Sequence, residues 1–159
     1  MFRKKLKKYV KQKIEGYTKA YFAAHPEIRL VVVAGSVGKT STKMAISTML
    51  SQKYRVRVHE GNHNMEFSAP LAIMGIPYPE DVWSVKQWRN VFRAADARVL
   101  QPADVDVIVQ EIGADHPGDI SRFGAYLHPD IAVITSVTAE HMEYFVTMEA
   151  VAREELTAA

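Results

Sequence analysis

The chain has 159 residues, enough for one domain with a sizeable core, and its 48% apolar and 24% charged residues are typical of globular proteins. It contains no cysteine, which excludes disulfides and thiolate metal sites and fits a reducing, cytoplasmic setting. Eight of its 20 Lys and Arg lie in residues 1–19 beside one acid, so the remainder has 12 basic and 17 acidic residues and is not expected to bind nucleic acid.

Residues 2–24 are expected to form an amphipathic helix. Apolar and aromatic residues recur from Phe2 to Tyr21 at three- and four-residue steps, with lysines between them. His25 precedes a proline, which disfavours helical backbone there and ends the helix. The helix either packs on the body with a solvated lysine face or contacts an anionic membrane, which would place the protein at the inner face of the membrane.

An apolar run, a glycine turn and a helix-forming segment follow one another in residues 30–50. Backbone N–H groups of such a turn converge on phosphate oxygens, Lys39 can reach the β- and γ-phosphates, and the Thr40 hydroxyl can ligate Mg²⁺. The match is to the short pattern G-x-x-G-K-[ST], because Val33 stands where a full P-loop has glycine. The alternative is an ordinary surface turn. The predicted nucleotide-binding residues are Gly35, Ser36, Val37, Gly38, Lys39, Thr40 and Ser41.

Strands and helices alternate along the rest of the chain. We expect strands at 55–59, at 105–113, covered on both faces, and at 131–135, also buried, with helices at 40–52, 71–75, 81–100, from 118 and at 148–156. This order implies right-handed βαβ crossovers. The predicted fold is α/β, a mostly parallel sheet with flanking helices of the P-loop NTPase kind, preceded by the amphipathic helix.

Four polar segments follow predicted strands: the phosphate loop, an Asn-containing loop at 60–70, Glu111 and His141. The carboxyl ends of parallel strands meet at one edge of a sheet, so all four should gather there. A carboxylate at the position of Glu111 could ligate Mg²⁺ beside a nucleotide. Taken singly, Glu111 could be a loop cap and His141 a polar surface residue. The expected meeting of all four segments at one edge of the sheet is a stronger argument for a site than any one of them.

These segments resemble the central, ATP-binding domain of the Mur ligase family, in particular the branch that adds D-alanyl-D-alanine to the UDP-muramoyl tripeptide. The similar stretches, in the family's order, are Gly35 to Lys43, Gly61-Asn62-His63-Asn64 with Ser68 to Leu71, Gln110 to Gly113 with Gly118-Asp119-Ile120, and Pro129 to Thr135 with Glu140 to Glu143.

The resemblance implies ATP and Mg²⁺ as cofactors and a carboxylate-bearing cell-wall precursor as substrate. The carboxylate would attack the γ-phosphorus to give an acyl phosphate, which an amine then converts to an amide. Lys39, Asn64 and His141 would be catalytic, Asn64 near the γ-phosphate. Thr40 and Glu111 would serve Mg²⁺, and His141 a second Mg²⁺.

The chain also departs from the family pattern. Only a helix (residues 1–27) precedes the partial ATP-binding domain (28–159), where the family has a UDP-sugar-binding domain. Glu155 stands where many members have a carbamylated lysine. The family's C-terminal domain would be missing or supplied by a second subunit, so we expect no amide formation from this chain alone. The alternatives are a non-catalytic module for assembly or membrane docking, or another P-loop NTPase.

Overall fold

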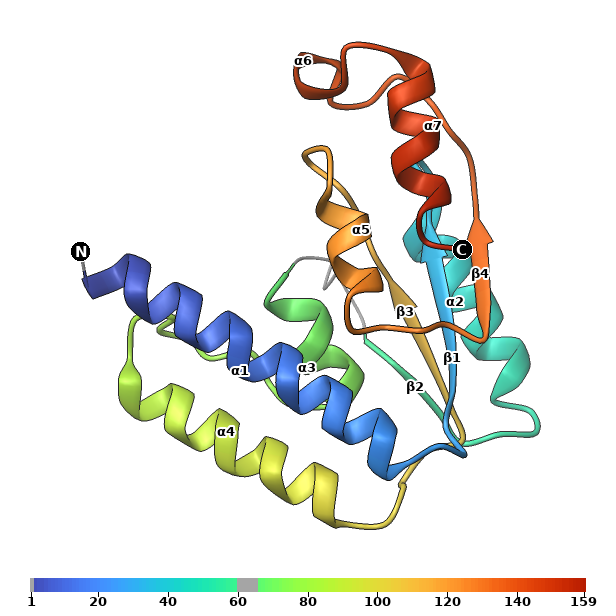
Figure 1. Ribbon diagram of the computed structural model, residues 1–159. Coiled ribbons are helices and arrows are strands. Elements are labelled where there is room, and N and C mark those ends of the chain that lie inside the picture. Colours follow the sequence, from blue (N-terminus) through green and yellow to red (C-terminus); the bar gives the residue numbers. More distant parts are fainter. Residues whose placement is uncertain (1, 60–65) are drawn as a thin grey trace.

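The computed structural model describes residues 2–59 and 66–159 (Figure 1). The elements in chain order are α1 (Phe2–Ala24), β1 (Arg29–Ala34), α2 (Lys39–Leu50), β2 (Val56–Val58), α3 (Ser68–Met74), α4 (Val85–Leu100), β3 (Val107–Glu111), α5 (Asp119–Gly124), β4 (Ile131–Ile134), α6 (Met142–Phe145) and α7 (Met148–Leu156). The α/β alternation is confirmed. None of the helices within the described ranges is long and apolar enough to cross a membrane.

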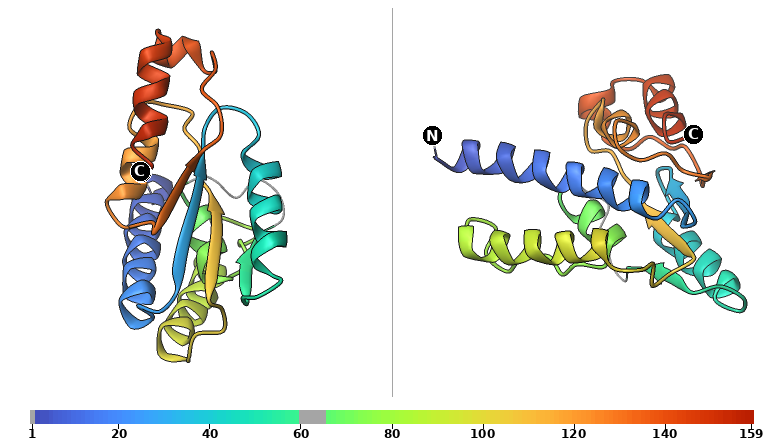
Figure 2. Two further views of the ribbon diagram at one scale, coloured as in Figure 1. Left: turned by 90° about the vertical axis from the view of Figure 1, so that its right-hand side faces the viewer. Right: turned by 60° about the horizontal axis from the view of Figure 1, so that its bottom comes forward.

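The four strands form one fully parallel sheet in the order β2-β3-β1-β4. The chain moves across the sheet in one direction from β1 to β2 and in the other from β2 to β3 and β4. Because the crossovers are right-handed, this reversal puts α2 on one face of the sheet and α3, α4 and α5 on the other (Figures 1 and 2). Helix α1 packs on the same face as α3 and α4. The reversal next to β1 creates the crevice at the carboxyl ends of the strands where such sheets bind ligands.

Alternate residues of β1 and β3 enter two hydrophobic cores. Leu30, Val32 and Ile108 belong to the larger core, which α1, α3, α4 and α5 cover. Val31 and Val33 belong to the smaller core beneath α2. In α1, the side chains of Val10, Ile14, Thr18 and Tyr21 are buried. The interpretation of α1 as a helix packed on the body is therefore confirmed.

Three details of the prediction were wrong. β4, expected to be buried, lies at an edge of the described sheet and contains no fully buried residue, with Ile131 56% exposed. The helix expected from residue 81 begins at Val85, because the Ser84 hydroxyl accepts a hydrogen bond from Gln87 N and caps it there. The short helix α6 was not anticipated.

Candidate functional site

The phosphate loop connects β1 to α2 at the carboxyl edge of the sheet (Figure 1). Gly35 and Gly38 both adopt positive φ, at 120° and 90°, which a residue with a Cβ rarely adopts. A Cβ on Gly35 would meet the Thr135 hydroxyl and lie 2.9 Å from Ser136 O. No side chain caps the start of α2 at Gly38, so its first N–H groups point into the loop. This geometry suits a phosphate group.

A second loop, residues 135–138 after β4, holds the phosphate loop in place. Ser36 N donates to Ser136 O at 2.7 Å, and Thr138 N donates to Ser36 Oγ at 3.0 Å. Val37 N donates to Ser136 Oγ at 3.3 Å. Sequence analysis missed this clamp. The available signal was the cluster of hydroxyl residues directly after a predicted strand.

Lys39 folds back onto the loop. Its Nζ donates to Gly35 O at 2.5 Å and to Ser36 O at 3.0 Å. The ammonium group thus occupies the concave side of the loop. To bind a phosphate group, Lys39 would have to leave these two carbonyl oxygens.

Two adjacent buried glutamates attach helix α7 to its neighbours, Glu155 to the phosphate loop and Glu154 to the start of α5. Glu155 Oε2 accepts a hydrogen bond from Gly35 N at 2.6 Å. Glu154 accepts from Gly118 N and Ile120 N at 2.8 and 2.7 Å and so caps α5. Burial raises the pKa of the Glu155 carboxyl above its ordinary value, although the Gly35 N–H and the Lys39 charge act in the opposite direction.

Replacing Glu155 tests this contact. Glu155→Ala leaves the buried Gly35 N–H without an acceptor and should lower the free energy of unfolding by about 1–3 kcal/mol. Glu155→Gln keeps an acceptor oxygen and removes the buried charge, so it should be at least as stable as the wild type at pH 7. Because the folded-state pKa is raised, ionisation costs stability as the pH rises, and the advantage of Gln should shrink as the pH falls below the unfolded pKa. Urea unfolding at several pH values measures both effects; an advantage that grows in acid would contradict the assignment.

Glu111 ends β3 as expected, but its carboxylate is ion-paired beneath the phosphate loop. Its Oε2 lies 2.9 Å from Lys43 Nζ, and the two side chains are 1% and 2% exposed. Beyond this contact, the same oxygen receives no hydrogen bond from the described residues. A buried carboxylate oxygen that accepts so few hydrogen bonds could act as a ligand to a cation. Lys43 lies one turn beyond Lys39 on α2, so both lysines face the site.

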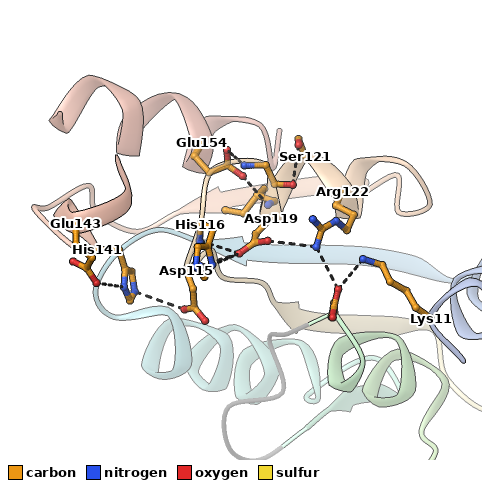
Figure 3. A network of polar contacts seen from close by, with 12 residues as sticks. Lys11, Asp115, His116, Asp119, Ser121, Arg122, His141, Glu143 and Glu154 are labelled. Atoms are coloured by element: carbon orange, nitrogen blue, oxygen red, sulfur yellow. Dashed lines mark hydrogen bonds and ion pairs between the residues drawn. The ribbon is translucent and has the colours of Figure 1, made fainter. Parts of the chain in front are cut away.

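His141 lies beyond the carboxyl end of β4, directly before α6. Its Nε2 is 3.7 Å from Asp115 Oδ1 and its Nδ1 is 4.0 Å from Glu143 Oε1 (Figure 3). The backbone of His141 is left-handed, with φ 50°, and it precedes the first residue of α6. Within residues 2–59 and 66–159, no three His, Asp or Glu side chains converge in a way that could hold a metal ion.

A polar network extends from the first turn of α5 through Glu66 to α1 (Figure 3). Arg122 pairs with Asp119 and Glu66 at 3.4 and 3.3 Å, and Glu66 also pairs with Lys7 and Lys11 at 2.8 and 2.7 Å. Partial burial opposes ionisation of Glu66, yet the hydrogen bonds from Lys11 and Lys7 lower its pKa below the ordinary value. The network borders a cavity of about 330 Å³. It attaches α1 to the carboxyl edge of the sheet.

The structure thus gathers most of the predicted residues at one edge. Gly35 to Gly38 form the loop, Lys39 to Ser41 are the first residues of α2, and Glu111 is ion-paired to that helix through Lys43. Asn64, predicted to be catalytic, lies outside the described residues.

Comparisons with known proteins agree with this arrangement. The family model described as the Mur ligase middle domain matches residues 33–157. The UDP-N-acetylmuramoyl-tripeptide–D-alanyl-D-alanine ligases of Rickettsia prowazekii and Bacillus subtilis are 27% and 28% identical to this chain, over 83% and 80% of its length. These matches cover 24% and 22% of the two relatives, so the chain spans about a quarter of the length of these curated proteins.

A solved structure has the same fold. The MurF ligase of Thermotoga maritima in complex with ADP superposes with a TM-score of 0.69 at 24% identity, covering 93% of this chain and 29% of that one. The fold of this chain is therefore that of one part of a larger ligase.

Proposed function

Because the chain belongs to the Mur ligase family, with its middle domain at residues 33–157, we propose that it is the ATP- and Mg²⁺-binding part of an ATP-dependent carboxylate–amine ligase. The phosphate loop carries the proposal, since two glycines at positive φ, an uncapped helix start and Lys39 meet in it. The ADP bound to the Thermotoga maritima relative supports an adenine nucleotide. Residues 28–159 would form the nucleotide-binding unit, to which α1 is added.

Some residues of the site would bind the phosphates, and others would hold the phosphate loop in place. N–H groups of the loop and the Lys39 ammonium would bind the β- and γ-phosphates, while the 135–138 clamp and Glu155 would fix the loop. Thr40 and Glu111 would hold Mg²⁺, which neutralises charge on the transferred phosphoryl group when bound. The part-satisfied Glu111 oxygen fits that role. His141 would serve a second Mg²⁺ only after a rearrangement that brings further ligands to it.

The proposed chemistry has two steps. A carboxylate oxygen of the precursor attacks the γ-phosphorus, the bond to the bridging oxygen breaks, and ADP leaves with an acyl phosphate formed. The amine nitrogen then attacks the acyl carbon, phosphate departs and the nitrogen loses a proton, which leaves an amide. By analogy with the named relatives, the precursor would be a UDP-muramoyl tripeptide and the amine D-alanyl-D-alanine or a similar compound. Asn64 would lie near the γ-phosphate.

Titration calorimetry of the 159-residue chain tests the nucleotide assignment. We expect weak binding of Mg·ATP and Mg·ADP, weaker binding of ATP when EDTA removes Mg²⁺, and the weakest binding of Mg·GTP. We expect no amide product from the chain alone. Absence of any ATP binding by the folded protein would overturn the proposal, and amide formation by the isolated chain would show that more of the machinery is present than we infer.

A further inference from the structure

Helices α1 and α4 lie side by side and form a layer that differs in charge from the rest of the molecule (Figures 1 and 2). Their sequences contain 12 of the chain's 20 basic residues and two of its 18 acidic ones, so the layer carries a formal charge of +10 and the remaining residues −8. Tyr9 and Tyr17 of α1 pack against Phe92 of α4 at 6.1 and 6.0 Å between ring centroids. The total of +2 therefore hides one strongly basic surface.

The basic residues at the start of α1 are not placed to stabilise the helix. Arg3, Lys4 and Lys5 occupy its first turn, which contains no acid. Positive side chains there oppose the helix dipole, which favours acids at an N-terminus. Lys4, Lys5 and Lys8 are exposed and make no ion pair with any described residue. A local rule broken in this way is expected where a surface serves a function.

Exposed aromatic rings lie beside these charges. The Arg3 guanidinium is 4.9 Å from the Trp83 ring, which brings the start of α1 to the start of α4. Phe2 is 65% exposed and Trp83 40% exposed, and Tyr78 is also exposed. An apolar cavity of about 260 Å³ lies beneath them. Aromatic rings next to lysines are typical of protein surfaces that sit at the interface of a membrane.

We propose that this basic–aromatic tip (Phe2, Arg3, Lys4, Lys5, Lys8, Tyr78 and Trp83) docks on the surface of an anionic lipid bilayer. The lysines would attract the anionic headgroups and the rings would enter the headgroup region, which provides the two signals that stable docking requires. In Figure 1 the tip points away from α2 and the phosphate loop, so a docked molecule would keep its nucleotide site open. The inference does not depend on the proposed ligase activity.

Co-sedimentation of the full chain with vesicles tests the proposal. We expect binding to mixed phosphatidylglycerol–phosphatidylcholine vesicles but not to phosphatidylcholine alone, and a loss of binding as NaCl screens the charges. Lys4→Glu/Lys8→Glu should weaken binding at least about 30-fold, since each lysine contributes about 1 kcal/mol near such a surface. Its melting temperature should not fall, because both side chains are exposed and an acid at position 4 is favourable in the first turn of the helix. Lys53→Glu/Arg153→Glu is the matched control, with the same charge change at exposed residues elsewhere.

Tryptophan fluorescence provides a second readout. Trp88 is 3% exposed and Trp83 is 40% exposed, so a blue shift on adding anionic vesicles would report Trp83, and Trp83→Phe should remove it. Equal binding to neutral vesicles, or unchanged binding of the Lys4→Glu/Lys8→Glu variant, would overturn the proposal. Retention on single-stranded RNA without vesicle binding would overturn it in favour of a nucleic-acid surface.

Discussion

Glu111→Ala is expected to lower the free energy of unfolding by about 3–5 kcal/mol, and Lys43→Ala by a similar amount. Each substitution removes one half of a buried ion pair, because the two side chains are 1% and 2% exposed and joined at 2.9 Å. Urea unfolding at pH 7 measures the loss. A loss below about 1 kcal/mol, the range of exposed ion pairs, would show that water reaches the pair.

The double variant Lys43→Met/Glu111→Leu separates the interaction from the burial. Removing both charges eliminates the desolvation cost as well as the attraction, so its stability should return to near that of the wild type. If the double variant instead loses the sum of the two single-variant changes in the free energy of unfolding, the pairing is contradicted. The double variant also gives a folded protein without the Glu111 carboxylate. If Glu111 holds Mg²⁺, adding Mg²⁺ should increase the stabilisation by ATP less in this variant than in the wild type.

The fold was largely predictable because its main signals are local in the sequence. A β-branched run followed by a glycine turn and a helix former specifies the phosphate loop within a dozen residues. The alternation of strands and helices then implies a parallel sheet whose strand ends meet at one edge. That step correctly placed Glu111 at the carboxyl edge beside the loop.

The contacts that complete the site were not predictable from such patterns. On α2, Lys43 and Ser47 are buried, whereas the apolar Met49 is 74% exposed. A lysine is assigned to solvent by default, and only its partner on a distant strand makes its burial favourable. The Glu155–Gly35 hydrogen bond joins residues 120 positions apart. The edge position of β4 likewise depends on which strands pair.

Lys39→Ala is expected to abolish the stabilisation of the chain by Mg·ATP. In the wild type, Mg·ATP at about 100 times its dissociation constant should stabilise the folded state by about 2.7 kcal/mol. Lys39 provides the positive charge on the concave side of the loop, within 3.0 Å of two loop carbonyls that it must leave for the phosphates. Thermal unfolding with and without Mg·ATP measures the shift in Tm.

Lys53→Ala is the matched control for this experiment, since it removes an exposed lysine just beyond the same helix. It should keep the full nucleotide-dependent shift. Without nucleotide, Lys39→Ala should unfold close to the wild type, because the Lys39 contacts are to carbonyl oxygens at a part-buried position. A shift that survives in Lys39→Ala would mean that the N–H groups of the loop suffice or that ATP binds elsewhere. Gly38→Val distinguishes these outcomes, because a β-branched residue opposes the positive φ required at that position and should remove only binding at the loop.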